Sequence, residues 1–471
     1  MKRILMLPFA GLGCIIPALE FAKRLTSSHQ VTLAVQASFA ALVEERLVRA
    51  PLHNIRLHVM DAIDIGPPTP SPYHNNQPFP FNTNRDQGAA AIRNLLKETF
   101  TGFCACTGHC VKDKHAQFDV IISDVFWGVE PVRFAASHHI PAYYFCTGNA
   151  GQLLMMIAVQ EDTPATNVQS DKFFWKVPGE GQKSLEYVPG TFKDTLLEGK
   201  RGLPYVRGVV CNSIREIDEA YLRSLESYDE MQSVKMWLPG PLLPETNTRE
   251  DESEAVVEQV TKWLDKQPEQ SVVYFSFGSH IPTKSEQAQE ILDALLSLGK
   301  PFIWSLNAAS FEGLPEEYRV DMRRHPELIS GMNFLILSWT PQTVILGHEA
   351  TAVFVSHCGW NSTLEALTMG VPVVGWPFVT DQKADAELLE SMAMGVVLPG
   401  TGFHAQRTIP VAEIVHNVKM VAGWNEESGE DKESTYGKAA QKWKSVIAEA
   451  RKPDGSSQRD LTNFLQDLQS F

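Results

Sequence analysis

The sequence lacks the marks of a membrane, secreted or nucleic-acid-binding protein. No apolar run reaches the roughly 18–20 residues of a membrane-spanning helix. Seven cysteines, an odd number without the spacing of a disulfide framework, favour a reducing compartment such as the cytoplasm. The formal net charge of −15 argues against nucleic acids and anionic membranes as partners, because phosphate-rich surfaces bind basic proteins. We therefore expect a globular cytoplasmic protein, and we expect a monomer.

Length and composition favour two domains. A chain of 471 residues is too long for one hydrophobic core, and 44% hydrophobic and 21% charged residues are ordinary for a globular protein. A Pro-rich join, Leu238–Pro244, is followed by a polar, acidic stretch. We predict a first domain over 1–240, a linker over 241–254, a second domain over 255–455, and a final helix over 456–471. No internal repeat is visible.

Strand and helix patterns alternate in both halves. The predicted strands are Arg3–Pro8, Val31–Val35, Ile55–Met60, Val120–Ser123, Ala142–Phe145, Val209–Asn212, Val272–Phe275, Phe302–Leu306, Asn333–Leu337 and Val353–Ser356. The predicted helices are Pro17–Ser27, Phe39–Ala50, Ala89–Phe103, Val129–His138, Glu216–Ser224, Val256–Asp265, Ser285–Leu298, Asn361–Leu367, Val411–Ala422 and Thr435–Ala450. This alternation predicts an α/β fold of two doubly wound, Rossmann-like domains that face each other across a cleft. Gly66–Arg85 and Gln160–Gly202 show little periodicity, so we predict irregular stretches there that contact a second substrate.

The segment Trp339–Gln382 is rich in groups suited to a nucleotide-sugar. Trp339 offers a flat face on which a base can stack, worth roughly 1–3 kcal/mol. His357–Trp360 fill the predicted turn between a strand and a helix, where backbone amides and the positive end of the helix dipole favour a phosphate. Gly359 permits close approach of the backbone, and Glu365 can accept hydrogen bonds from a ribose diol. The segment therefore predicts a site for a sugar diphosphate.

This segment resembles the signature box of plant-type UDP-sugar-dependent glycosyltransferases, the small-molecule family with the GT-B fold. The match has no gaps at Trp339, Gln342, His357, Gly359, Trp360, Asn361, Ser362, Glu365, Asp381 and Gln382. The resemblance implies that Trp339 stacks on uracil, and that Gln342 and Glu365 hold the ribose. It implies that the diphosphate is held by His357, Asn361 and Ser362. It also implies that Asp381 and Gln382 bind the sugar hydroxyls, with Gln382 typical of glucose-using members, and that the last helix returns to the first domain.

Two further positions fit the resemblance. Ser279 ends the tetrapeptide Ser276-Phe277-Gly278-Ser279 and is placed to meet the β-phosphate, although the same tetrapeptide also suits an ordinary turn. Thr147, in YYFCTGNAG, stands where family members place a hydroxyl near the diphosphate or sugar. A threonine after a strand is also a common helix cap.

The predicted catalytic pair departs from the family pattern. Members carry Gly-His-x-x-Pro in the first strand–helix turn, whereas this chain has Gly13-Cys14-Ile15-Ile16-Pro17. Asp124 matches the aspartate that orients the histidine. Five interpretations stay open: a Cys14 thiolate base, Asp124 acting directly or through water, another histidine such as His74 or His280, an acceptor that is itself acidic, or an inactive variant. General base catalysis typically contributes about 10²–10⁴-fold, so its loss would matter most for alcohols.

Metal-binding patterns are scarce. Cys104, Cys106 and Cys110 lie near His109 and His115, but their spacing fits no common zinc pattern. No Asp-x-Asp pair stands near the signature segment. We therefore predict no metal and no cofactor besides the UDP-sugar co-substrate.

The predicted function is an inverting glycosyl transfer from a UDP-sugar, with UDP-glucose favoured by Gln382. The acceptor would be a small hydrophobic phenol, carboxylic acid or alcohol. The alternatives are a UDP-sugar-binding protein without catalysis and a UDP-sugar epimerase or hydrolase on the same fold. The latter would need acid and base groups around the sugar, and the sequence offers none beyond Asp381.

Overall fold

The chain forms two compact units. The computed structural model describes residues 1–49, 54–60, 92–96, 118–159, 172–177, 181–186, 190–244, 254–278, 281, 283–306, 308–316, 318, 328–331, 333–379, 381–402, 407–424 and 434–471. Unit 1 comprises Met1–Pro244 and Glu449–Phe471, and unit 2 comprises Glu245–Ala448. Unit 1 is therefore built from two stretches that are far apart in the sequence.

Unit 1 is organised around a parallel sheet. Among the described residues this sheet has seven strands in the order β3-β2-β1-β4-β5-β8-β9. The strands are β1 (Arg3–Leu7), β2 (Gln30–Gln36), β3 (Ile55–Met60), β4 (Val120–Asp124), β5 (Ala142–Cys146), β8 (Gly208–Cys211) and β9 (Lys235–Trp237). The chain runs outward from β1 through β3 and then returns to β4 on the other side. The strand order thus reverses between β1 and β4, and such switch points are where doubly wound sheets bind ligands.

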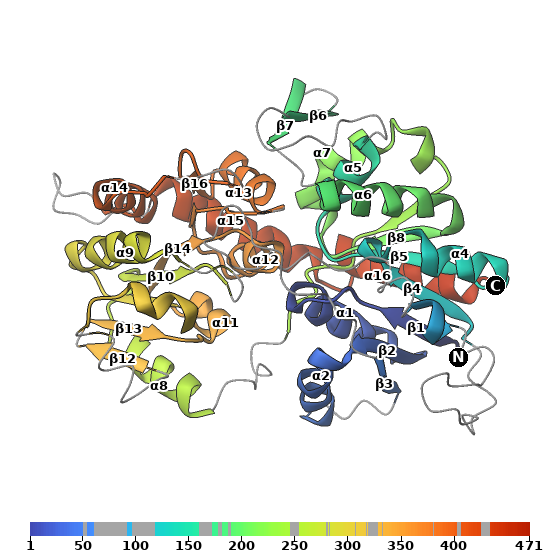
Figure 1. The fold of residues 1–471 in the computed structure, drawn as a ribbon, viewed down its shortest axis with the longest axis horizontal. Coiled ribbons are helices and arrows are strands. Elements are labelled where there is room, and N and C mark those ends of the chain that lie inside the picture. Colours follow the sequence, from blue (N-terminus) through green and yellow to red (C-terminus); the bar gives the residue numbers. More distant parts are fainter. Residues whose placement is uncertain are drawn as a thin grey trace. The chain divides into compact units, whose positions relative to one another are not determined.

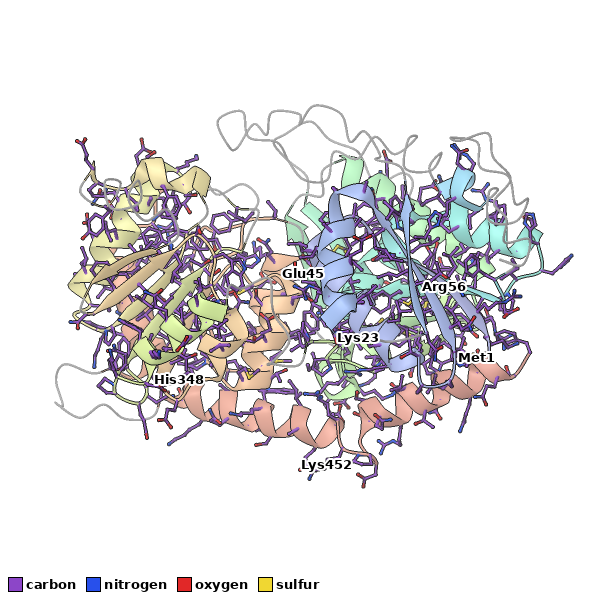
Figure 2. All side chains as sticks on the ribbon, turned by 90° about the horizontal axis from the view of Figure 1, so that it is seen from below. Met1, Lys23, Glu45, Arg56, His348 and Lys452 are labelled. Atoms are coloured by element: carbon purple, nitrogen blue, oxygen red, sulfur yellow. The ribbon has the colours of Figure 1, made fainter. Side chains whose placement is uncertain are left out.

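Helices cover both faces of this sheet (Figure 1). They are α1 (Leu12–Leu25), α2 (Ala37–Arg49), α4 (Val129–Ser137), α5 (Ala150–Ala158), α6 (Gly190–Gly202), α7 (Arg215–Leu225) and α16 (Ser456–Gln469), with short 3₁₀ turns at Val125–Trp127, Leu203–Tyr205 and Asp229–Met231. Alternate residues of β1 enter different cores. Ile4 and Met6 pack with α1 and α16, whereas Leu5 and Leu7 pack with α4, α5 and α6. Burial on both faces explains why the parallel strands read as continuous apolar runs. Figure 2 shows the side chains that fill these layers.

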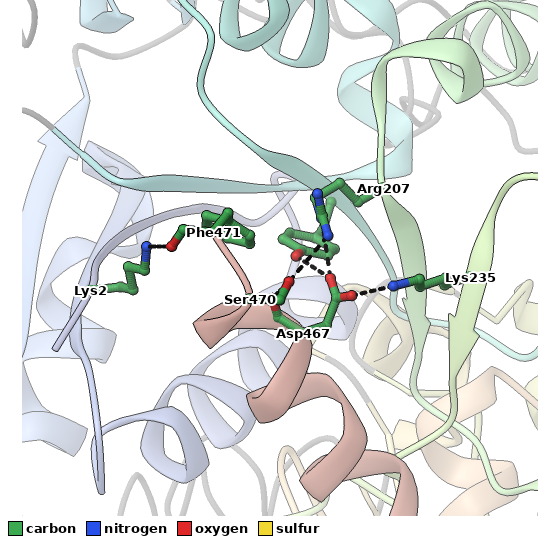
Figure 3. A network of polar contacts seen from close by, with 7 residues as sticks. Lys2, Arg207, Lys235, Asp467, Ser470 and Phe471 are labelled. Carbon is green, nitrogen blue, oxygen red and sulfur yellow. Dashed lines mark hydrogen bonds and ion pairs between the residues drawn. The ribbon is translucent and has the colours of Figure 1, made fainter.

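The final helix is fixed to unit 1 by apolar and polar contacts. Phe464 is fully buried and packs its ring against Phe21, Tyr143 and Trp237. Asp467 accepts hydrogen bonds from Tyr143 (2.5 Å) and Arg207 (3.2 Å) and pairs with Lys235 (Figure 3). These donors hold the pKa of Asp467 below its usual value although burial opposes the shift. The helix is therefore part of the unit 1 core.

Unit 2 repeats the doubly wound plan. In the described part of the unit, one sheet has seven strands in the order β12-β13-β11-β10-β14-β15-β16, and only the β12–β13 pair is antiparallel. The strands are β10 (Val272–Ser276), β11 (Phe302–Ser305), β12 (Leu328–Gly331), β13 (Phe334–Leu337), β14 (Thr351–Ser356), β15 (Val373–Gly375) and β16 (Gly395–Val397). The strand order reverses between β10 and β14, which makes that boundary the switch point of unit 2.

The helices of unit 2 also form two layers. They are α8 (Glu254–Leu264), α9 (Ser285–Ser297), α11 (Gln342–Gly347), α12 (Trp360–Met369), α13 (Gln382–Ser391), α14 (Val411–Ala422) and α15 (Thr435–Ala450), with a 3₁₀ turn at Ala308–Gly313. Figure 1 shows α9 and α14 on one side of the sheet and α8 and α11 on the other. Val273, Phe275 and Trp304 form the centre of the core beneath α9 and α14.

The predicted strands are confirmed to within one residue at most ends. Three other predictions are wrong: they concern Gln160–Gly202, Trp360 and the start of the first helix, which is Leu12 and not Pro17. Gln160–Gly202 is not wholly irregular, because its described residues form an antiparallel hairpin of β6 (Lys172–Val177) and β7 (Gly181–Glu186), followed by α6. Tertiary packing of Leu196 and Leu197 stabilises α6 despite its glycines. Trp360 is the first residue of α12 and not part of the preceding turn. The predicted loop Gly66–Arg85 and most of the predicted helix Ala89–Phe103 lie outside the described residues.

Candidate functional sites

The first candidate site begins where β10 and β14 of unit 2 end side by side. Ser276 and Ser356 are register partners, and each hydroxyl accepts the amide of the second residue after it, Gly278 at 3.3 Å and Cys358 at 3.0 Å. Gly278 and Cys358 both have left-handed backbones, with φ of 72° and 59°. The two parallel strands thus end in two separate turns of the same conformation. Both turns lie at the switch point of unit 2.

His357 lies between two glycines at this switch point. A Cβ atom on Gly278 would lie 3.0 Å from the imidazole Cε1 and Nε2, and one on Gly359 would lie 2.8 Å from Nε2. Gly359 itself has an ordinary φ of −61°, which any residue can adopt. The missing side chain is therefore needed to make room for the imidazole and not to relieve backbone strain. The two loops therefore hold the His357 ring in one position.

Helix α12 opens directly after this histidine. Gly359 is its N-cap, and the amide of Thr363 donates the first helical bond to the Gly359 carbonyl at 3.0 Å. The amides of Trp360, Asn361 and Ser362 precede that bond, at the positive end of the helix dipole. Such a helix start favours a phosphate beside the imidazole.

Gln342 and Glu365 form one hydrogen-bonded group. The Gln342 side-chain amide donates to Ser362 Oγ at 2.9 Å and to the Glu365 carboxylate, and its oxygen accepts from the Tyr274 hydroxyl at 3.0 Å. Tyr274 also contacts Thr340 Oγ1 at 2.7 Å. Glu365 is 1% exposed, so this carboxylate is fixed before any ligand arrives. Trp339, three residues before Gln342, is 37% exposed, although large apolar side chains are usually buried.

Gln382 is oriented by the loop after β15. Its side-chain oxygen accepts the backbone amides of Phe378 at 2.9 Å and Val379 at 3.0 Å. Because both partners are donors, the oxygen and nitrogen of this carboxamide are not interchangeable. The NH2 group is therefore the end that Gln382 can offer to a ligand. Asp381 precedes it as the N-cap residue of α13.

A second candidate site lies at the switch point of unit 1. Cys14 occupies the first turn of α1, Asp124 ends β4, and Thr147 follows β5. The Thr147 hydroxyl donates to Cys14 Sγ at 3.5 Å. Helix α1 begins at Leu12, five residues before its predicted start, and this places Cys14 inside the helix. Helix α1 and the ends of β4 and β5 thus bring together residues that are up to 133 positions apart in the sequence.

Asp124 is fully buried, with 0% of its surface exposed. Its Oδ1 accepts the Phe126 amide at 2.9 Å. Burial raises the pKa of Asp124 to about 7, while the Phe126 amide, the Phe9 amide and the Cys14 thiol oppose that shift. The other carboxyl oxygen, Oδ2, is buried and has no hydrogen-bond partner among the described residues. An acid with this pKa changes protonation state near neutral pH.

Aromatic rings stand beside this carboxyl group. Phe9 packs edge to face against Phe126, with ring centres 5.7 Å apart, and against Trp127 at 4.9 Å. The Trp127 indole donates to the Pro8 carbonyl at 3.0 Å, which ties the loop after β4 to the loop after β1. The Asp124 carboxyl group therefore lies next to an apolar surface formed by the rings of Phe9, Phe126 and Trp127.

The predicted site residues fall into two groups. One group belongs to unit 2: Trp339, Gln342, His357, Gly359, Trp360, Asn361, Ser362, Glu365, Asp381 and Gln382. The other group, Cys14, Asp124 and Thr147, belongs to unit 1. Ser279 and the alternative bases His74 and His280 lie outside the described residues. Sequence reasoning missed Tyr274 and Thr340, which support Gln342, and also Phe9 and Trp127. No local pattern marks these four, because each acts through a partner that is distant in the sequence.

Two searches of the described residues bear on other predictions. No group of three or more His, Cys, Asp or Glu residues in the described part of the chain could hold a metal ion. The chemistry without a metal nevertheless stays a prediction. No helix among the same residues is long and apolar enough to span a membrane.

Comparison with known proteins decides the family. The family model described as "UDP-glucoronosyl and UDP-glucosyl transferase" matches residues 231–406. The chain is 30% identical to the anthocyanidin 3-O-glucosyltransferase of Solanum melongena over 341 residues, which cover 70% of this chain and 74% of the relative. The chain belongs to the UDP-glycosyltransferase family. This glycosyltransferase is also 26% identical to the indole-3-acetate beta-glucosyltransferase of Zea mays over 497 residues, 98% of each chain.

Solved structures identify the fold of this enzyme. Medicago truncatula UGT71G1, crystallised with UDP-glucose, matches with a TM-score of 0.78 and 23% identity over 99% of this chain and 98% of that one. A Polygonum tinctorium UDP-glucosyltransferase that glucosylates indoxyl matches with a TM-score of 0.78 and 24% identity over 100% and 99%. The enzyme therefore has the GT-B fold, and the predicted α/β fold class and family are confirmed.

Proposed function

We propose that this glycosyltransferase moves glucose from UDP-glucose to a small hydrophobic acceptor, with inversion at the anomeric carbon. The proposal rests chiefly on His357, which two glycines hold at the opening of α12, at the switch point of unit 2. A diphosphate bound there would meet an imidazole and a helix start together. Donors fixed in this way stabilise the charge that develops on UDP as it leaves.

The remaining donor contacts follow from the geometry of unit 2. The exposed face of Trp339 would stack on uracil, and the buried Glu365 carboxylate, held by Gln342, would accept the ribose hydroxyls. Gln382 would donate its NH2 group to a sugar hydroxyl, with Asp381 accepting beside it. This set needs no metal, because side-chain and backbone donors would offset the diphosphate charge. Ser279 would add a hydroxyl to the same phosphate.

Unit 1 would bind the acceptor. The rings of Phe9, Phe126 and Trp127 suit an aromatic or otherwise apolar molecule, whose nucleophilic oxygen would lie toward Cys14 and Asp124. We propose that Asp124 takes up the acceptor proton in place of the missing histidine. Its pKa of about 7 lies close to that of an ordinary histidine, so burial gives this carboxyl group a basicity suited to neutral pH.

The test is incubation of the full chain with UDP-glucose and a phenol, a carboxylic acid or an alcohol. We expect UDP release in step with a new β-glucoside, identified by mass spectrometry and by the proton coupling of its anomeric carbon. Free glucose without glucoside would favour a hydrolase, and an altered sugar nucleotide would favour an epimerase. Binding of UDP-glucose without turnover of any acceptor would favour a non-catalytic protein, and each of these three results would contradict the proposal.

A further inference from the structure

Cys14, Asp124 and Thr147 meet at the ends of three neighbouring strands of unit 1. We propose that they form a proton relay, in which Cys14 passes the acceptor proton to Asp124 and Thr147 is a positioning residue for the Cys14 sulfur. This inference rests on the proposed function and specifies its catalytic step. It assigns Thr147 to the acceptor side of the reaction, whereas the family resemblance implies a hydroxyl near the donor diphosphate or sugar.

Burial separates the roles of the thiol and the carboxyl group. Asp124 is 0% exposed, so its carboxyl group is less accessible to an acceptor molecule than the half-buried Cys14 thiol. Cys14 is only half-buried and lies in the helix that follows β1, whose last residue, Leu7, pairs with Ser123 of β4 next to Asp124. The thiol also opposes the rise in the Asp124 pKa that burial causes. The sulfur is therefore the group through which a proton can travel from the acceptor to the buried carboxylate.

The Thr147 hydroxyl acts on the other side of the sulfur. It donates to Cys14 Sγ at 3.5 Å, which uses a sulfur lone pair and leaves the S–H bond to point elsewhere. Thr147 is itself 6% exposed, so few other conformations are open to it. Its hydrogen bond would also stabilise the partial negative charge that the sulfur carries while a proton passes.

The corner after Thr147 is held from two sides. Asn149 Oδ1 accepts the Gln152 amide at 3.0 Å and caps α5. Asp218 of α7 accepts the Ala150 amide at 2.7 Å through Oδ2. A Cβ atom on Gly148 would lie 2.4 Å from Gln152 Oε1, so the Gly148 backbone packs closely against the Gln152 side chain. This packing fixes the Thr147 hydroxyl against the thiol.

The relay balances in atoms and electrons. The acceptor oxygen forms its bond to the anomeric carbon as the bond from that carbon to the UDP oxygen breaks, and UDP leaves with the electron pair. The acceptor proton moves to Cys14 Sγ while the original thiol proton moves to Asp124. After release of the glucoside, Asp124 returns one proton to water through Cys14. No oxidant, reductant or covalent enzyme intermediate is needed.

The test compares two acceptors across a set of variants. A phenol with a pKa of about 10 needs a base, whereas a carboxylic acid with a pKa of about 4 is already ionised at pH 7. With the phenol, we expect Cys14→Ala and Asp124→Asn to lower kcat about 100-fold or more. Cys14→Ser retains an O–H that can pass a proton, so its loss should stay within about 10-fold. With the carboxylic acid, all three variants should stay within about 3-fold of the wild type, since the removed base contributes nothing there.

The role of Thr147 is tested by measuring whether its substitution changes kcat for the phenol or KM for UDP-glucose. Thr147→Val should lower kcat for the phenol about 3- to 10-fold, equivalent to one hydrogen bond, and leave KM for UDP-glucose unchanged. Thr147→Ser should restore kcat. Thr462→Val, at an exposed position of α16, is the matched control and should change neither quantity.

Three results would overturn the relay. A raised KM for UDP-glucose in Thr147→Val with unchanged kcat would place Thr147 on the donor. Equal losses with both acceptors in Cys14→Ala would assign Cys14 to binding and not to proton transfer. Melting temperatures several degrees below the wild type in Thr147→Ser as well as Thr147→Val would reduce Thr147 to a structural role. Failure of the wild type to glucosylate either acceptor would contradict the proposed function itself, and the relay with it.

Discussion

Replacing Gly359 by alanine offers a test of His357 that leaves the fold in place. The added Cβ would lie 2.8 Å from His357 Nε2, whereas ordinary contacts of a Cβ atom begin at 3.4 Å. The imidazole must therefore move by about 3.4 − 2.8 = 0.6 Å or rotate away. Gly359 has φ −61° and ψ 148°, which alanine adopts without strain. The backbone should accept the substitution, and the displacement of one ring is the main effect.

A displacement of this size has a large expected effect on catalysis. Misplacing a reacting group by about 1 Å can cost on the order of 100-fold in rate. We therefore expect Gly359→Ala to lower kcat/KM for UDP-glucose about 10- to 100-fold. Thermal stability should stay equal or rise, because removing a glycine from a compatible site stabilises a protein by about 0.4–1 kcal/mol.

The assays are steady-state kinetics with UDP-glucose and thermal denaturation of the same preparations. Gly347→Ala is the matched control, because its Cβ would contact only Met369 Sδ, at 3.6 Å. It should keep wild-type kinetics. Wild-type kcat/KM in Gly359→Ala with an unchanged melting temperature would refute the argument that His357 must occupy its present position.

Three other substitutions test separate parts of the account. Trp339→Ala should weaken UDP binding about 5- to 150-fold in calorimetry, the equivalent of 1–3 kcal/mol of stacking, and unchanged affinity would exclude a base on this ring. Gln382→Glu keeps the oxygen that Phe378 and Val379 require but removes the NH2 donor, so KM for UDP-glucose should rise about 10-fold at constant melting temperature. Burial raises the pKa of Asp218 to about 7. Between about pH 4 and pH 7, Asp218 is therefore protonated in the folded chain but ionised in the unfolded chain. As a result, the free energy of unfolding falls as the pH rises through that window. Asp218→Asn removes the group that titrates. Relative to the wild type, the variant's free energy of unfolding should therefore increase by roughly 2–3 kcal/mol more at pH 8 than at pH 5. A difference between variant and wild type that does not depend on pH would contradict the shifted pKa.

Much of the fold could be predicted, because parallel strands buried on both faces appear in the sequence as continuous apolar runs. The strands β1, β4 and β5 and the helices α14 and α15 fall where the sequence predicts them. Helix α5 does not stand out, because Ala150–Ile157 is buried on all sides and such a helix has no amphipathic period. In α6, glycines suggest a loop, yet they are demanded by packing. A Cβ atom on Gly202 would lie 1.7 Å from the Tyr144 hydroxyl, and one on Gly199 would lie 2.4 Å from Met156 Sδ.

The candidate site was predictable in its residues but not in its contacts. The signature segment predicts which side chains would bind a UDP-sugar, since its motif is contiguous. It cannot predict that Gly278, far outside the segment, completes the space around His357. The contact between Thr147 and Cys14 joins the loop after β5 to the first turn of α1, and their closeness depends on the order of strands in the sheet. Such pairings arise from topology, and no local pattern encodes them.

The central claim is that unit 2 binds uridine diphosphate through Trp339, His357 and the start of α12. It is tested most directly by titrating UDP into the full chain in an isothermal calorimeter, with EDTA present to remove divalent metals. The account predicts saturable binding at one site per chain, with affinity reduced in Trp339→Ala and in Gly359→Ala but not in Gly347→Ala. Absence of binding to the folded wild-type chain at millimolar UDP would contradict it.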